Sequence, residues 1–392
     1  MKKGLAAALL VAVFAGLFVM WSAGRWATSV AQVGVLAVAF LWACSLFVDR
    51  GALPHGVAPL PLVGILCWGA AQLACGWTAY RWQTWESMLY WLTNLMALMI
   101  ASSLSQSPVI GQFLLKWLFV CGVALALISA VQNFTSDGRV FWMFDAIYRD
   151  EVWGPFLSRN QYAAFIELLL PVAWVRALDG EDNYWPHIVI TAGLFSCVVA
   201  SASRAGSVLS IGELIVIPAI LLFRRTISPS SCGKRFASLL LLAVLFAAVV
   251  GPERVWERLR MQDPYADRRD MTVASVAMLR GRPVRGFGLG TWPTVYPGYA
   301  KEDDGLFANQ AHNDWAQAAA EGGVPVLLCF AAFFVWSVSA GWRSPWGLGL
   351  AFVLLHAFVD YPIQRQALGA FFFLLAGVVA QARNTTRDVI SL

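Results

Sequence analysis

The chain has few charged residues, and this scarcity excludes most classes of soluble protein. Asp, Glu, Lys and Arg make up 13% of its 392 residues, whereas roughly 25% is usual in soluble domains. Hydrophobic residues make up 59%. So small a polar share cannot cover a water-exposed globule of this size, and disordered and collagenous chains are excluded as well. The net charge of +5 is modest, so no nucleic acid partner is expected.

The chain also lacks the residue spacings of metal and disulfide sites. Its seven cysteines are scattered without paired metal-ligand spacing, and all but Cys232 lie in apolar runs, so we interpret them as small hydrophobic residues. The polar loop described below holds no Asp-x-Asp pair, and its adjacent carboxylates Asp303 and Asp304 are interpreted as a solvated loop tip. We therefore expect no metal and no cofactor.

Long apolar runs fill most of the chain. A helix needs about 20 apolar residues to cross a bilayer. About twelve runs fit this need, near residues 4–21, 28–48, 57–76, 86–104, 110–132, 158–177, 186–203, 205–223, 236–251, 323–340, 346–360 and 367–382. The first run follows two lysines as in a signal peptide, but Met20-Trp21 is a poor cleavage site. The sequence thus predicts an all-α polytopic membrane protein with about 12 transmembrane helices.

Basic residues indicate how these helices are oriented, because Lys and Arg in short loops stay on the cytoplasmic side. With the N-terminus inside, the predicted cytoplasmic ends hold Lys2, Lys3, Arg50, Arg224, Arg225, Lys234, Arg235, Arg343, Arg383 and Arg387. Both termini are then cytoplasmic. Two long segments face outward, residues 133–157 and a loop at 252–320 between helices 9 and 10.

These boundaries divide the chain into four parts. We expect an N-terminal bundle at 1–132, spans 6 to 9 with an outer segment at 133–251, the outer loop at 252–320, and three C-terminal spans with a short tail at 321–392. The outer loop is where polar residues gather. Helical charge spacing predicts one helix over 253–260, and apolar spacing predicts a second over 270–279. The glycine-rich stretch 281–290 then ends that helix. No strand precedes these glycines and no Lys-Ser/Thr follows them, so we interpret them as a tight turn at the membrane face and not as a nucleotide loop.

His312 is the candidate general base. It lies in the segment AHNDWAQAAAEGG at 311–323, where Asn309 or Asn313 could cap a helix. Near a helix N-terminus the macrodipole disfavours the imidazolium, so the ring stays neutral and can accept a proton near neutral pH. The alternative is an ordinary surface or hydrogen-bonded histidine.

Two arginines stand where apolar runs begin. Arg204 lies in SASRAG at 201–206, where one run passes into the next almost without a loop, and Arg159 has the same position in GPFLSRNQYAAF at 154–165. An arginine at the membrane boundary is costly unless it pairs, binds an anion or extends to the interface. Several convergent guanidinium groups suit a diphosphate, whose oxygens they bind bidentately.

Four motifs in this order resemble the O-antigen ligase and O-antigen polymerase superfamily. They are the segments at 154–165, 201–206 and 311–323, together with Arg268, which precedes Pro283 by fifteen residues and is followed by GFGLGTW at 286–292. The resemblance covers about residues 150–380. It implies a multi-helix inverting glycosyltransferase of the GT-C type, which takes a glycan from undecaprenyl diphosphate at the periplasmic face of the bacterial cytoplasmic (inner) membrane.

The resemblance also implies roles for individual residues. The essential histidine of the family falls on His312, and its diphosphate-binding arginines fall on Arg204 and Arg268, with Arg269 as a one-residue alternative. Beside these, we expect Arg159, Asn160, Asn313 and Asp360 to support the site or bind substrate. Asp360 lies at the outer end of a span, where it could orient Arg204 or the acceptor or form a structural ion pair. Ligases of the family often carry a second histidine beside the essential one, but residue 311 is alanine here. Ligase and polymerase therefore both remain open, and with them the acceptor, which is the lipid A core, a growing glycan or a protein hydroxyl.

Two other classes of function fit a polytopic chain. A transporter or flippase for lipid-linked oligosaccharides would also carry intramembrane arginines, but it usually shows internal repeats and charges in mid-span. The two halves of this chain do not resemble each other, and its polar residues gather in one loop. A non-catalytic scaffold for envelope assembly would leave the arginine and histidine arrangement without a purpose. The asymmetry favours an enzyme that works at one membrane face.

Overall fold

The computed structural model describes residues 1–48, 56–145, 152–156, 158–179, 184–250, 266–301 and 307–382, with the side chains of 247–250 and 266–267 left aside. The helix that we predict over 253–260 and the carboxylate pair at 303–304 lie outside the described residues. The amphipathic helix predicted over 270–279 is present as part of α11 (Ala266–Gly281), which ends where the glycine-rich stretch begins.

The described part of the chain is α-helical apart from one short hairpin, in which β1 (Arg139–Val140) pairs with β2 (Phe144–Asp145). The first nine helices are α1 (Lys2–Val19), α2 (Arg25–Val48), α3 (Leu60–Ala74), α4 (Arg81–Ser105), α5 (Pro108–Thr135), α6 (Arg159–Asp179), α7 (Trp185–Ala200), α8 (Arg204–Phe223) and α9 (Pro229–Val250). After α11 come α12 (Trp292–Val295), η2 (Tyr296–Gly298), α13 (Asp314–Arg343), η3 (Pro345–Gly347), α14 (Gly349–His356), η4 (Pro362–Gln364) and α15 (Gln366–Ala380).

Eight of the described helices, namely α1, α2, α4, α5, α6, α8, α9 and α13, are long and apolar enough to cross a membrane. Four shorter apolar helices, α3, α7, η3 with α14, and α15, coincide with the remaining predicted runs. The prediction of an all-α polytopic membrane protein is confirmed. The number twelve stays a prediction, because the four shorter helices fall below the length of a full span.

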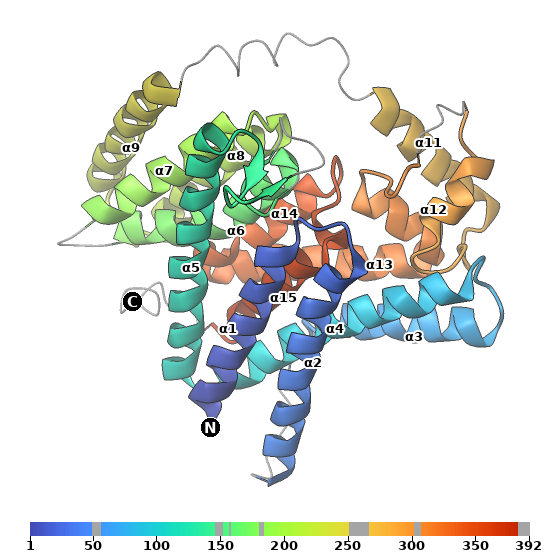
Figure 1. Ribbon diagram of the computed structural model, residues 1–392. Helices are drawn as coiled ribbons and strands as arrows, with labels where there is room; N and C mark the ends of the chain where they lie inside the picture. Colours follow the sequence, from blue (N-terminus) through green and yellow to red (C-terminus); the bar gives the residue numbers. More distant parts are fainter. Residues whose placement is uncertain are drawn as a thin grey trace.

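Two helices form the centre of the bundle. Every residue of α6 from Asn160 to Leu178 is buried, and so is α15 from Gln366 to Val379. Helices that are buried all round lie at the centre of a large bundle. Small residues allow close packing there, since a side chain at Gly377 of α15 would collide with the backbone of α4 at Leu98. In Figure 1, α14 and α15 lie in the middle of the molecule and α5 crosses beside them.

The candidate residues lie at one end of this bundle. The N-termini of α6, α8 and α13 and the C-terminus of α14 meet there, and α11 packs against α13 at the same end. In the view of Figure 1, α9 and α11 stand at opposite sides of this end. The bundle therefore brings together segments that are up to about 200 residues apart in the chain.

Candidate active site

The N-termini of α6 and α8 are held together by a pair of short side chains. Ser203 is the N-cap of α8, where its hydroxyl oxygen accepts a hydrogen bond from the Gly206 amide at 3.2 Å. The same hydroxyl donates to Asn160 Oδ1 at 2.8 Å. Gly206 permits this approach, because a Cβ there would lie 2.5 Å from the Cβ of Ala163 on α6.

This contact places two of the candidate arginines at adjoining helix N-termini. Arg159 and Arg204 are the first residues of α6 and α8, and both are half-buried. The N-terminal end of a helix carries partial positive charge, which adds to the charge of the two guanidinium groups. Helix N-termini of this kind favour anionic ligands such as phosphate.

Asp360 is the residue on which the other elements converge. It follows the last turn of α14, and its side chain is 2% exposed. Asn160 Nδ2 donates a hydrogen bond to Oδ2, and the Tyr361 amide donates to Oδ1 at 2.8 Å. Nη1 of Arg268 lies 3.5 Å from Oδ2, and Nδ1 of His312 lies 3.9 Å from Oδ1. One buried carboxylate thus links α6, α11, α14 and the segment that leads into α13.

His312 lies directly before the cap of α13. The side chain of Asn313 is the N-cap and accepts a hydrogen bond from the Ala316 amide at 2.9 Å, so of the two capping residues considered above Asn313 is used. His312 has a φ of 49°, in the left-handed region, which is uncommon outside glycine and found at functional sites. Its imidazole ring packs edge-on against Tyr361 with ring centroids 4.7 Å apart.

Burial and charge set the protonation of this histidine. Burial lowers the pKa of His312 below its ordinary value, the neighbouring Asp360 carboxylate raises this pKa, and Arg268 lowers it. The net direction is downward, so the ring is neutral at pH 7 and can accept a proton. This agrees with the neutral imidazole expected at a helix N-terminus.

Arg268 and not Arg269 contacts this polar cluster. Arg268 Nη1 donates to the Val359 carbonyl oxygen at 2.8 Å, in addition to its ion pair with Asp360. Arg269 is the next residue of α11 and is exposed. Successive residues of a helix point about 100° apart, so α11 can turn only one of the two toward Asp360.

The glycine-rich stretch attaches α11 to the bundle. Glu321 of α13 is buried, and its carboxylate accepts hydrogen bonds from the amides of Gly290 at 2.7 Å and Trp292 at 3.2 Å. Gln72 of α3 accepts from the Leu289 amide at 3.0 Å. Gly288 has a φ of 108° and lies against Thr78, so a side chain there would collide. The stretch is a tight, anchored turn, and it fixes α11 and with it Arg268.

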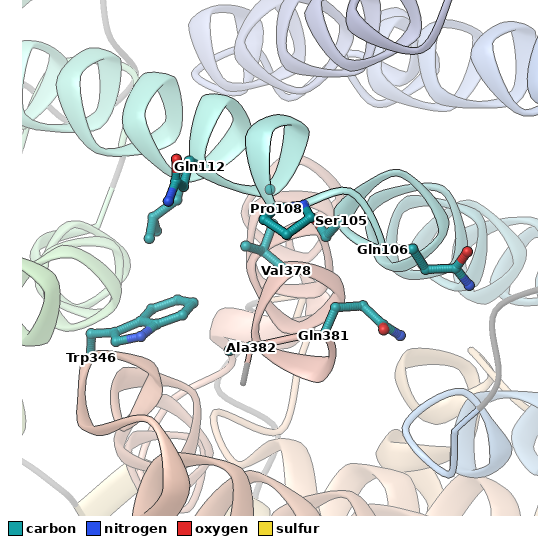
Figure 2. A pocket seen from close by; sticks show the side chains of 10 residues that line it. Ser105, Gln106, Pro108, Gln112, Trp346, Val378, Gln381 and Ala382 are labelled. Atoms are coloured by element: carbon teal, nitrogen blue, oxygen red, sulfur yellow. The ribbon is translucent and has the colours of Figure 1, made fainter. Parts of the chain in front are cut away.

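A separate cavity lies at the other end of the bundle. It has a volume of about 350 Å³ and lies between the end of α4, the start of α5, η3 and the end of α15. Figure 2 shows Gln112, Trp346 and Gln381 around it. None of its lining residues is charged or a histidine, so it offers neither a general base nor a cation. The groups that proton transfer and anion binding need, a histidine and cations, lie instead in the cluster around Asp360.

The cluster has the parts of a base-assisted displacement. A neutral imidazole lies beside a carboxylate that can orient it, as a general base requires. Cations and helix N-termini stand nearby to stabilise negative charge. In the described residues no three His, Cys, Asp or Glu side chains are grouped to hold a metal ion.

Sequence reasoning missed several residues that build this arrangement. Ser203, Gln72 and Glu321 are positioning residues, and Tyr361 packs on His312. The sequence offers a signal for Ser203 only, since a serine directly before the first residue of a predicted helix is a typical N-cap.

Comparison with known families agrees with the motifs. The family O-antigen ligase matches residues 189–331, from α7 into α13. This segment contains Arg204, Arg268 and His312, whereas Asn160 and Asp360 lie outside it and join them only through the fold. No curated protein matched the chain. The match supports the superfamily that the motifs indicate and, in general terms, glycan transfer of the O-antigen ligase or polymerase type.

Proposed function

We propose that this chain transfers a glycan from undecaprenyl diphosphate to an acceptor hydroxyl, with inversion at the anomeric carbon, as its match to the O-antigen ligase family over residues 189–331 suggests. The reaction takes place at the periplasmic face of the bacterial inner membrane. Both termini lie on the opposite, cytoplasmic side. The observation that carries the proposal is the convergence of His312, Asp360 and Arg268 at the helix N-termini that bear Arg159 and Arg204.

His312 acts as the general base. It removes the proton from the acceptor hydroxyl while the hydroxyl oxygen forms a bond to the anomeric carbon of the donor. The bond from that carbon to the diphosphate oxygen breaks at the same time, and undecaprenyl diphosphate leaves. A single displacement of this kind inverts the anomeric configuration. Asp360 orients the imidazole and stabilises the imidazolium that forms.

Arg204 and Arg268 bind the diphosphate. Negative charge develops on the leaving group in the transition state, and fixed cations stabilise it without a metal ion. The half-buried positions of both side chains support this role, because charges that are partly withdrawn from water interact more strongly. Asn160 holds the Asp360 carboxylate, and Asn313 holds the helix start behind His312. On this proposal the outer loop 252–320 supplies the general base His312 and one diphosphate-binding arginine, Arg268.

The direct test uses purified protein, an undecaprenyl-diphosphate-linked glycan and candidate acceptors. Release of undecaprenyl diphosphate together with a glycoside of inverted configuration, undiminished by a metal chelator, is the expected result. A product with retained configuration would contradict the single displacement. Parallel reactions with the lipid A core, with the repeat-unit glycan and with a protein acceptor assign the acceptor.

A further inference from the structure

A second polar pair lies deeper in the bundle than Asp360. Nδ1 of His356 and Oε1 of Glu167 are 2.7 Å apart, and both side chains are 0% exposed. Glu167 lies on α6 and His356 is the last residue of α14. Ionisable side chains inside a membrane bundle are costly, and they persist where they serve a function. The displacement proposed above uses neither residue.

His356 supports the turn that carries Asp360. Its carbonyl oxygen accepts hydrogen bonds from the amides of Val359 at 3.0 Å and Asp360 at 3.1 Å. In the same turn, the Val359 carbonyl oxygen accepts a hydrogen bond from Arg268. The Ala357 carbonyl oxygen accepts one from the Asp314 amide at 2.9 Å. A shift at the end of α14 therefore moves the carboxylate and the attachment points of α11 and α13 together.

Helix α6 holds the end of α14 at two points. Asn160 contacts the Asp360 side chain and Glu167 contacts the His356 side chain. These two residues of α6 are seven positions apart, which is about two helical turns, so they share one face of the helix. Gly349 at the start of α14 also lies against the Glu167 backbone, where a side chain would collide.

We propose that Glu167 and His356 are a positioning pair, which fixes the last turn of α14 against α6 and thereby holds the Asp360 carboxylate beside His312 and Arg268. The pair touches neither donor nor acceptor. Its effect on transfer rests on the proposed function, whereas its effect on the surroundings of His312 does not. Placement matters here because the contact between His312 and Asp360 is already 3.9 Å long, and a displacement of about 1 Å costs on the order of 10²-fold in rate.

The charged groups that face His312 are Asp360, after α14, and Arg268, from α11, and the Tyr361 ring packs against it. Asp360 is the one that favours the imidazolium. If the pair is broken and Asp360 moves away, His312 titrates at a lower pH. A purely structural pair would alter the amount of folded protein and leave this titration unchanged.

The experiment follows the histidine directly. The chain has four histidines, so selective ¹⁵N-histidine labelling gives few signals, and the His312→Ala variant assigns the one that matters. In Glu167→Leu and in His356→Leu, which leave no hydrogen bond between the two positions, we expect His312 to titrate about 0.5–1 pH unit lower than in the wild type. We also expect kcat for glycan transfer to fall about 10- to 100-fold with the KM for the donor unchanged. In a double variant with glutamine at both positions the two amides can hydrogen-bond to each other, and kcat recovers toward the wild-type value.

Ser102→Ala is the matched control, because Ser102 is buried on α4 and accepts a hydrogen bond from Gln381 at 2.9 Å, at the other end of the bundle. It should leave the titration of His312 and kcat unchanged. The proposal is overturned if the single variants leave His312 titrating as in the wild type, or if kcat falls only in proportion to folded protein. If the single variants shift the titration of His312 but the wild-type chain transfers no glycan, the proposed function is refuted and the positioning pair is retained.

Discussion

Replacing Asp360 by asparagine removes the negative charge at the centre of the site, together with the acceptor of the Asn160 Nδ2 hydrogen bond. The amide is nearly the same size, and its oxygen can still accept from the Tyr361 amide, so the turn after α14 should persist. What disappears is a negative charge 3.9 Å from His312 Nδ1 and 3.5 Å from Arg268 Nη1. The variant therefore tests the orienting carboxylate without deleting a side chain.

The magnitude follows from the distance. Two unit charges about 4 Å apart interact by about 4 kcal/mol at an effective dielectric constant of 20, which equals about 3 pKa units and is an upper limit. The His312 side chain is 32% exposed, and water screening reduces the effect to roughly 1 unit. Asp360 raises the pKa of His312, so its removal lowers this pKa further.

The assay is the pH dependence of glycan transfer. A general base must be neutral, so the rate falls as the pH drops through the pKa of His312, which lies below its ordinary value. In Asp360→Asn we expect this limb about 1 unit lower in pH and a rate at pH 7.5 reduced by about 10²-fold, because the imidazole is neither oriented nor stabilised as it takes the proton.

The control is Asp270→Asn on α11. Asp270 forms an exposed ion pair with Lys301 at 3.1 Å, which contributes little, so rate and limb should be unchanged. An Asp360→Asn enzyme of wild-type rate, or one whose acidic limb moves to higher pH, would refute the reasoning.

Three further predictions concern the arginines, the anchored turn and the topology. Arg204→Lys and Arg268→Lys should each reduce transfer at least about 10-fold at normal protein levels, because a point charge cannot reproduce the bidentate guanidinium contact, whereas Arg225→Lys should transfer normally; a fully active Arg204→Lys enzyme would show that this residue only extends to the interface. Gly288→Val should lower the melting temperature of the purified protein, since a side chain at a φ of 108° collides with Thr78, between α3 and α4, and costs about 1–3 kcal/mol; an unchanged melting temperature would mean that the turn does not anchor α11. A cysteine at Val284, which is 57% exposed, should react with a membrane-impermeant maleimide in intact spheroplasts of a cysteine-free variant; labelling only after permeabilisation would invert the orientation.

The sequence was sufficient for the class of fold because hydropathy acts locally. Each predicted apolar run coincides with a helix, since any segment of about 20 apolar residues must satisfy its own backbone hydrogen bonds in the membrane. The short loop before α8 is local as well and followed from the apolar runs, and local capping rules offered Asn313 as one of two candidate caps of α13.

The connections within the site could not be read from the chain. Asn160 and Asp360 are 200 residues apart, and Glu167 and His356 are 189 apart. Within an apolar run, a single glutamate or histidine gives no sign of its partner. Only the packing of α6 against α14 decides that these side chains meet. The sequence thus supplied candidate residues, and the tertiary fold determined which of them act together.

The most direct test of the account is the rate of transfer per bound donor in His312→Ala. The change removes the proposed proton acceptor and leaves Arg204 and Arg268 to bind the diphosphate, so donor binding by the purified variant should remain near the wild-type value. Transfer should fall by about 10²–10⁴-fold, the range for loss of a positioned general base. Undiminished turnover would contradict the central claim, and loss of donor binding with an unchanged rate per bound donor would make His312 a phosphate ligand instead.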